Sequence, residues 1–354
     1  MIAHDSSSGT QSLVAVKQKS KGLLPAELSS DASVAGFLRQ LLSASHDRGD
    51  ARAAALVPWV CDRMPSVNSR KAYFHDLASF VSHLATVGIN PLDATGDDIR
   101  IYKEALRQSG KSSASIAHML SALRGTYEQF GKRKLVEWDR VRDIQAVTSP
   151  RVEKNTTPAL SEAEARRLLH APDTSTLLGL RDHALLFVFF KTACRCSAVA
   201  GARVGSLERT DTDYYLLVRE KGNKQQRKAL LEAAPAVRAY LNAAAIGDDL
   251  DGPLFRPIAK DRRTILRKPL DRRTIWYIVK KYAREAGINT ERLGGRGIAV
   301  HALRKTAITN ALEHGAKMEQ VQQLAGHADI RTTQLYYQPR ERDAEEAARH
   351  IQIR

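Results

Sequence analysis

The residues best suited to chemistry lie in the C-terminal half of the chain. His301 and Arg304 stand three positions apart, a spacing that places an imidazole and a guanidinium on one face of a helix. His327 follows further along, and Tyr336 stands nine residues after it. Upstream, Arg195 comes directly after an apolar segment. A buried guanidinium without a partner is costly, so this position predicts a bound anion.

Together these residue types suit the cleavage of a phosphodiester. Arg195 and Arg304 can hold the non-bridging oxygens with planar forks, and His301 and His327 can donate hydrogen bonds or move protons. Tyr336 can attack phosphorus. Ionising a phenol at pH 7 costs about 4 kcal/mol, which proximity and the positive field can supply. Such an attack forms a phosphotyrosine, whose covalent bond keeps the energy of the broken one, so that rejoining needs no ATP.

Each of these residues also has an ordinary structural explanation. His301 and Arg304 could be an exposed polar pair on a helix. Arg195 could serve in a structural ion pair, and His327 could cap a loop.

Two positions leave a choice between neighbours. Tyr336 and Tyr337 are adjacent, and successive helical residues point about 100° apart, so one ring can face a site while the other packs in the core. Lys221 and Lys224 flank a Gly-Asn turn, and both could be solvated. One of them can protonate the departing oxygen.

In order and spacing, these segments resemble the tyrosine recombinases, the phage integrase and Xer/Cre superfamily. The resemblance covers residues 160–340 and rests on Thr192–Arg195, the Lys221 hairpin, His301-x-x-Arg304, Leu324–His327 and Thr332–Tyr336. It implies a site-specific DNA recombinase that cleaves and rejoins DNA through a covalent 3′-phosphotyrosine intermediate, leaves a free 5′ hydroxyl, and needs no metal or other cofactor. The catalytic residues that it implies are Arg195, Lys221 as general acid, His301, Arg304, His327, and Tyr336 as nucleophile.

Two positions depart from the pattern of that family. Ala193 stands where the family often has glycine, and Ala198 stands where it often has an acidic residue, three positions after Arg195. The alanine at position 198 removes a carboxylate that would help to hold the site residues in place. We expect this loss to affect the rate of the reaction more than its identity.

Composition supports a nucleic-acid partner. The 354 residues include 55 Lys and Arg against 39 Asp and Glu, a formal net charge of +16. This excess predicts binding to a polyanion, nucleic acid before membrane. The three cysteines exclude a disulfide framework and indicate a reducing, cytoplasmic setting. The Cys-x-Cys spacing at Cys194 and Cys196 is poor for zinc. The longest apolar run, residues 184–190, is far short of the roughly 20 residues that a membrane span needs.

Periodicity and turn signals divide the chain into segments. We expect a flexible arm, either featureless or tracking DNA, then a helical domain, a linker, a catalytic domain and a tail helix that docks on its own domain or on a neighbouring subunit. The expected bounds are 1–30, 31–144, 145–158, 159–338 and 339–354. The fold class is mainly α with a small β-sheet.

The helical domain resembles the core-binding, SAM-like domain of the recombinases, which implies a two-domain clamp around DNA. Apolar spacing predicts helices over 68–84, over 112–130, and from a cap at Asp97 to Leu106. In the catalytic domain it predicts strands over 214–220 and 225–231, together with helices from Ser161 and over 182–190, 234–244, 272–286, 301–314, 317–325, 330–337 and 342–351.

The expected partner is double-stranded DNA. Residues 256–284 carry eleven Lys or Arg against two Asp and predict a footprint on the DNA backbone. The helix over residues 112–124 is a candidate for the major groove. Candidate DNA-binding residues are Arg70, Lys71, Lys111, Arg124, Arg272 and Arg273.

The resemblance further implies a homotetramer on two DNA sites, with accessory DNA-bending proteins as potential partners, at work in the cytoplasm as a nucleoid-associated or mobile-element protein. Two other functions fit the same residues. One is a transposase or telomere-type resolvase with the same chemistry, and the other is a DNA-binding module that has lost cleavage.

Overall fold

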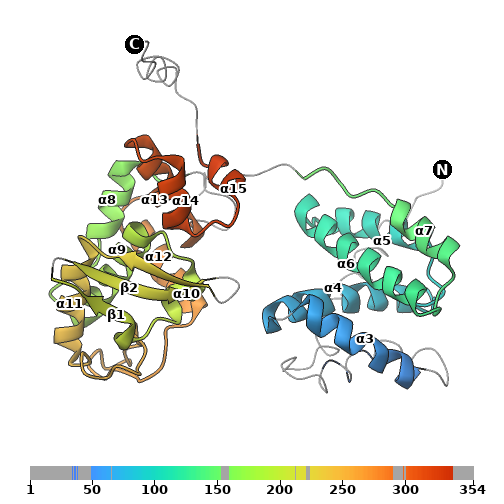
Figure 1. The fold of residues 1–354 in the computed structure, drawn as a ribbon, viewed down its shortest axis with the longest axis horizontal. Coiled ribbons are helices and arrows are strands. Elements are labelled where there is room, and N and C mark those ends of the chain that lie inside the picture. The colour runs from blue at the N-terminus through green and yellow to red at the C-terminus, as the bar shows by residue number, and fades with distance from the viewer. Residues whose placement is uncertain are drawn as a thin grey trace, which may run out of the picture. The chain divides into compact units, whose positions relative to one another are not determined.

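The computed structural model describes residues 34, 36, 38, 49–64, 66–152, 159–211, 213–220, 224–289, 298 and 300–337. The chain divides into two compact units, residues 1–155 and 156–354, each with an apolar core of its own (Figure 1). The division falls inside the segment 145–158. The expected arm over 1–30, the tail over 339–354 and Lys221 lie outside the described residues.

Unit 1 is helical throughout its described part. Its aromatic side chains pack inward, with ring centroids 5.1 Å apart for Phe80 and Tyr102 and 5.3 Å apart for Tyr127 and Phe130. Its buried tyrosines keep their hydroxyls satisfied: Tyr102 bonds Ser79 Oγ at 2.8 Å. The helices are α3 (Gly49–Arg63), α4 (Val67–Thr86), α5 (Gly96–Gln108), α6 (Ser113–Lys132) and α7 (Trp138–Ala146).

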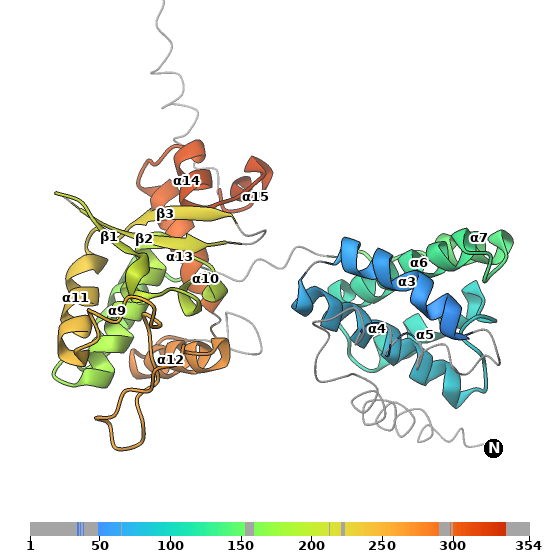
Figure 2. The same ribbon diagram turned by 60° about the horizontal axis from the view of Figure 1, so that its bottom comes forward.

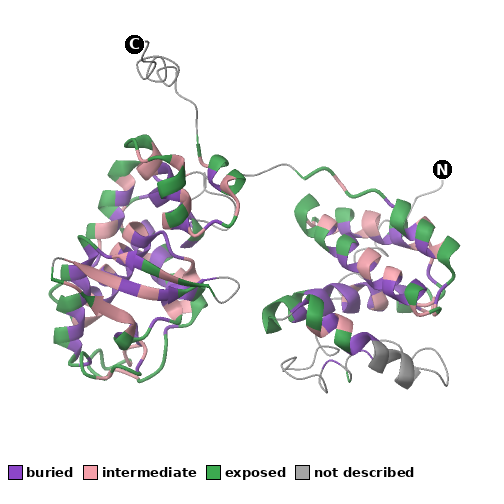
Figure 3. Ribbon diagram, in the orientation of Figure 1, coloured by how far each residue is buried: buried purple, intermediate pink, exposed green. Residues whose placement is uncertain are grey.

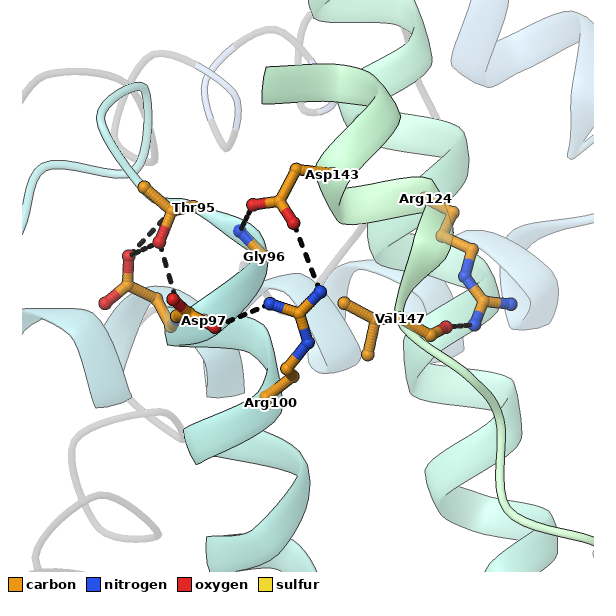
Figure 4. Close-up of polar contacts among 8 residues, drawn as sticks. Thr95, Gly96, Asp97, Arg100, Arg124, Asp143 and Val147 are labelled. Atoms are coloured by element: carbon orange, nitrogen blue, oxygen red, sulfur yellow. Dashed lines mark hydrogen bonds and ion pairs between the residues drawn. The ribbon is translucent and has the colours of Figure 1, made fainter. Parts of the chain in front are cut away.

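The start of α5 corrects one expectation. Thr95, not Asp97, is the N-cap: its side chain accepts a bond from Asp98 N, and the Asp98 carboxylate accepts from Thr95 N at 2.8 Å. Asp143 on α7 accepts a bond from Gly96 N at 2.7 Å and contacts Arg100 at 3.1 Å (Figure 4). A Cβ at Gly96 would lie 2.5 Å from that carboxylate, so a larger residue there would displace the Asp143 side chain.

Unit 2 combines helices with a small antiparallel sheet of order β1-β2-β3. The expected strand pair is confirmed, and β1 is an addition. The strands are β1 (Leu207–Arg209), β2 (Tyr214–Arg219) and β3 (Gln225–Ala229). The helices are α8 (Glu162–His170), α9 (Leu177–Thr192), α10 (Cys196–Ala200), α11 (Ala233–Ala244), α12 (Arg272–Glu285), α13 (Val300–Glu313), α14 (Met318–Ala325) and α15 (Ile330–Gln334), with the 3₁₀ turn η1 (Val204–Ser206) before β1.

The core of unit 2 forms around α9. Nine of its sixteen residues are buried, because it packs against α8, α11 and α13 at once, and Figure 3 shows the buried residues on these inner faces. The β3 side of the sheet faces α14 and α15 (Figure 2). No helix in the described ranges is long and apolar enough to cross a membrane.

The register of the β2–β3 pair places two buried charged residues on the inner face of the sheet. Leu216 pairs with Lys228 and Val218 with Gln226, so these four residues share one face. Leu216 and Val218 are buried, as is Glu220, the next residue on that face, at 6% exposure. An apolar face therefore ends in a buried acid directly after β2 and carries a buried lysine on β3.

Candidate active site

Arg304 lies at the centre of the site. It projects from α13, is 2% exposed, and is among the largest fully buried side chains of the described residues. Its Nη1 donates to the carbonyl of Ala193 and its Nη2 to the carbonyl of Ala325, both at 2.5 Å. A buried guanidinium held in this way fixes the ends of α9 and α14 against α13.

The backbone conformation of Ala193 is one that glycine adopts most easily. It ends α9 in the left-handed conformation, with φ 48° and ψ 25°, which costs a residue with a Cβ roughly 1–2 kcal/mol. Its buried methyl group packs in a small cluster with Ile308, Val321 and Ala325, and that burial offsets part of the cost. Alanine thus keeps the carbonyl of residue 193 directed at Arg304.

Arg195 follows at the start of α10 and has an anionic partner within the protein. Its Nη1 donates to Glu220 Oε2, and its main-chain N donates to Glu220 Oε1 at 3.3 Å. The Arg195 side chain is one third exposed, at 33%, whereas that of Glu220 is 2% exposed. No further hydrogen bond of the Arg195 side chain is found among the described residues, so Nε and Nη2 can take a second anion.

His327 and Tyr336 lie next to each other. His327 follows Gly326, which ends α14 at φ 65°, and its Nδ1 bonds Thr333 Oγ1 at 2.9 Å. The Tyr336 ring stacks on the imidazole at 5.9 Å between centroids and 20° between planes. Tyr336 is half-buried, whereas Tyr337 is 41% exposed. Of the two tyrosines, Tyr336 is the one that faces the histidine.

The positive charges of the site act on its histidines. Burial lowers the pKa of His327 to about 4, with further lowering from Arg304 and Arg195. Loss of surrounding solvent also lowers the pKa of His301 on α13, and the same two arginines add to the effect. Tyr336 in turn raises the pKa of Arg304, which burial lowers. These mutual effects place the five side chains in one electrostatic neighbourhood, and the pKa of His327 leaves that imidazole neutral at pH 7.

The low pKa of His327 makes stability depend on pH. The unfolded imidazole, at 6.5, binds a proton that the folded one, at about 4, does not. The free energy of unfolding therefore falls as the pH drops from 6.5 to 4, by up to about 3 kcal/mol. His327→Asn should remove most of that dependence, measured by urea unfolding at pH 4.5 and pH 7. A variant that keeps the full pH dependence of the parent would contradict the assignment.

Lys228 and Glu220 are site residues that the sequence did not reveal. Lys228 on β3 is 3% exposed, and its Nζ donates to the carbonyl of Leu324 on α14. Burial lowers its pKa, and Glu220 raises it. Its neighbours Gln225, Gln226 and Arg227 are polar, so the segment resembles a solvated strand. Only the sheet register shows that Lys228 points inward.

The candidate DNA-binding residues of unit 1 fall into two groups. Lys71 is exposed and Lys111 half-buried, whereas Arg70 is buried and its Nε donates to the Met64 carbonyl at 2.8 Å. This burial argues against Arg70 as a DNA contact, because its guanidinium holds the end of α3. Arg124 donates to the carbonyl of Val147 and joins α6 to the segment after α7 (Figure 4).

In unit 2 the basic run divides in the same way. Arg256 and Arg267 share the carboxylate of Asp249 at 2.7 Å each, which lowers the pKa of that acid to about 2. Arg272 and Arg273 are exposed in the first turn of α12. Lys260, Arg262 and Arg263 are exposed in the loop before it. No group of three or more potential metal ligands occurs in the part of the chain described here.

Two family models match the chain. The phage integrase family model matches residues 158–342, and the model of the phage integrase N-terminal SAM-like domain matches residues 61–134. The chain is 33% identical over 272 residues to tyrosine recombinase XerD of Pseudomonas aeruginosa, which covers 76% of this chain and 86% of that protein. It is 32% identical over 275 residues to the XerD of Bifidobacterium longum, covering 75% and 84%.

Solved structures share the fold. The XerH site-specific recombinase bound to difH substrate, in a pre-cleavage complex, matches with a TM-score of 0.62 at 16% identity, covering 96% of this chain and 94% of that one. A lambda integrase dimer bound to a COC′ core site matches with a TM-score of 0.59 at 16% identity, covering 83% and 96%. At 16% sequence identity, these matches show a common fold and nothing more specific.

Proposed function

The chain belongs to the phage integrase family, the tyrosine recombinases, and from that membership we propose how its own residues cut and rejoin DNA. It is a site-specific recombinase of the tyrosine type. We propose that it cleaves double-stranded DNA through a covalent 3′-phosphotyrosine intermediate and rejoins the ends without metal or ATP.

The convergence of five side chains from separate segments carries this proposal. Arg195 comes from the start of α10, His301 and Arg304 from α13, and His327 and Tyr336 from either side of α15. Arg304 ties these segments together through the carbonyls of Ala193 and Ala325. His301, His327, Tyr336 and Arg195 all interact electrostatically with Arg304, and a group of two guanidinium groups, two imidazoles and a phenol supports the binding of a phosphodiester.

The proposed reaction divides the work among these residues. Arg195 and Arg304 stabilise the charge that grows on the non-bridging oxygens. The Tyr336 oxygen bonds to phosphorus as the bond to the 5′ oxygen breaks, and the phenolic proton passes to a neutral imidazole, His327 being the one stacked on the ring. Lys221 gives a proton to the departing oxygen. Rejoining reverses these steps, since the phosphotyrosine keeps the energy of the broken bond.

The DNA partner follows from the family and from charge. Lambda integrase, which shares the fold, is solved bound to DNA. We propose that Arg272, Arg273 and the loop with Lys260, Arg262 and Arg263 contact the phosphate backbone, because these cations are exposed. The working compartment that we propose is the bacterial cytoplasm, which suits Cys61, Cys194 and Cys196 as free thiols.

A suicide substrate tests the proposed function. A nick just 3′ of the cleavage position lets the short 5′-hydroxyl fragment diffuse away, so every cleavage event traps the protein on DNA. Candidate sites come from sequencing the DNA that the protein retains in cells. A denaturation-resistant adduct identifies the enzyme, whereas a mobility shift without adduct identifies a DNA-binding protein that has lost cleavage.

We further propose that recombination takes place in a homotetramer on two DNA sites, linked through residues 339–354. This segment carries Ala344, Ala347, Ala348 and Ile351 at helical spacing. A helix of about ten residues is marginal alone and needs a surface to dock on.

Truncation after Gln338 should therefore leave binding to a single site intact and abolish synapsis and strand exchange. Size analysis of the protein on DNA checks this expectation. A truncated protein that still assembles tetramers and recombines would show that the tail docks on its own subunit.

A further inference from the structure

Glu220 is a buried acid in a site proposed to bind a phosphate, where its negative charge is unfavourable. The Glu220 side chain is 2% exposed, and burying a carboxylate is costly unless it is paired and hydrogen-bonded. Its negative charge also opposes the approach of DNA. The benefit must therefore lie in what Glu220 holds, and both of its oxygens bond to Arg195, one to the side chain and one to the main chain.

Glu220 also closes the end of the β2–β3 ladder. Its main-chain N donates to the carbonyl of Lys224 at 2.9 Å, just beyond the last pair of the β2–β3 ladder, Arg219 with Gln225. Lys221 follows Glu220 directly in the chain. One residue thus connects the start of α10 with the end of β2, directly before Lys221 in the sequence.

We propose that Glu220 is a positioning residue of the cleavage reaction, holding Arg195 by Nη1 and by its main chain so that Nε and Nη2 face the phosphate. This inference rests on the proposed function. It makes Glu220 the source of a carboxylate that the family often places on α10, three residues after the arginine. In this chain that carboxylate comes from the end of β2 instead.

The surroundings of Ala198 agree with this relocation. Ala198 is 3% exposed on α10, and it borders a cavity of about 580 Å³ beside the β2 residues Leu217, Val218 and Arg219. A longer side chain at position 198 has room in that cavity. Position 198 also stands three residues after Arg195, a spacing at which helical side chains are neighbours, so we expect a glutamate there to reach the Arg195 guanidinium.

Charge neutralisation alone does not account for Glu220. Three cations, Arg195, Arg304 and Lys228, interact with one another and with this single acid. A site that keeps net positive charge still attracts phosphate. The two explanations of Glu220 differ when Arg195 is also replaced. If Glu220 acts by positioning Arg195, replacing Glu220 costs no further cleavage rate in that background. If Glu220 only supports the fold, the same replacement still costs its full factor.

The test measures single-turnover cleavage of the suicide substrate at saturating full-length protein. Glu220→Gln should cleave about 10- to 100-fold more slowly than the parent, because a misplaced group costs on that scale. In an Arg195→Ala background the same substitution should cost nothing further. Glu208→Gln on β1 is the matched control, since Glu208 forms an exposed ion pair with Arg227 in the same sheet, and it should cleave at the parent rate.

A second variant pair keeps the test decisive. Glu220→Asp keeps the charge but is one methylene shorter, so it should also be slow. Ala198→Glu combined with Glu220→Gln should recover most of the lost rate, which a purely structural role would not produce. Glu220→Gln that cleaves at the parent rate, or that slows Arg195→Ala by its full factor, overturns the inference. A parent protein that forms no adduct overturns the proposed function instead.

Discussion

Replacement of Tyr336 by phenylalanine should abolish the covalent adduct with a suicide substrate and leave DNA binding within about twofold of the parent. The substitution removes only the proposed nucleophile. The ring keeps its packing against His327 and against the cluster around Ile308 and Val321. Within the described residues the Tyr336 hydroxyl makes no hydrogen bond, so its loss leaves no buried partner unsatisfied. The adduct is measured on a denaturing gel and binding by mobility shift.

The adjacent tyrosine is the natural control for that experiment. Tyr337→Phe also removes one phenolic oxygen, but from a side chain that is 41% exposed, and it should form adduct at the parent rate. Adduct formation by Tyr336→Phe would refute the assignment and make Tyr337 the nucleophile. Loss of adduct in both variants would show that the Tyr337 hydroxyl is also required for attack by Tyr336.

Local patterns account for the spacing of several candidate site residues. The spacing of His301 and Arg304 is set by one helical turn, and the Gly326 left-handed cap fixes the chain direction just before His327. The interval to Tyr336 is filled by a five-residue helix that Asp329 caps, as its sequence indicates. Features determined within ten residues of chain are readable because backbone geometry alone imposes them.

Contacts between distant segments were not readable in the same way. Glu220 and Arg195 meet only because β2 ends against the start of α10, and Lys228 is buried only because α14 covers that face of β3. Neither residue differs in type from a solvated strand residue. The same limit explains Arg70, whose positive charge predicts DNA contact although packing directs it to the Met64 carbonyl.

Competition between neighbouring residues accounts for the error at α5. Asp97 and Thr95 both have side chains that cap helices well. Thr95 prevails because Asp98 stands three positions later and completes a reciprocal capping box, while Asp143 on α7 takes the Gly96 N–H. The second of these contacts is tertiary. Tertiary contacts therefore help to decide which residue becomes the N-cap, and helix-capping propensity alone does not predict these contacts.

Replacement of Lys221 by alanine should slow cleavage by about 10² to 10⁴, the usual contribution of a positioned acid. The departing 5′ oxygen is a strongly basic alkoxide unless a proton reaches it as the bond breaks. Within the proposed mechanism Lys221 supplies that proton from the hairpin that begins at Glu220. A substrate with sulfur in place of the 5′ bridging oxygen leaves as a thiolate, which is stable near neutral pH without a proton. Lys221→Ala should therefore cleave this substrate at close to the parent rate.

The second lysine of the turn makes that experiment specific. Lys224 is exposed, and its carbonyl, not its ammonium group, closes the hairpin by accepting the Glu220 N–H. Lys224→Ala retains that carbonyl and should cleave both substrates at the parent rate. If Lys224→Ala is instead the slow variant that sulfur rescues, the acid is Lys224. If sulfur rescues neither lysine variant, the proton comes from elsewhere in the site, and the buried Lys228 becomes the residue to replace next, because its position on β3 places a third ammonium group beside both arginines.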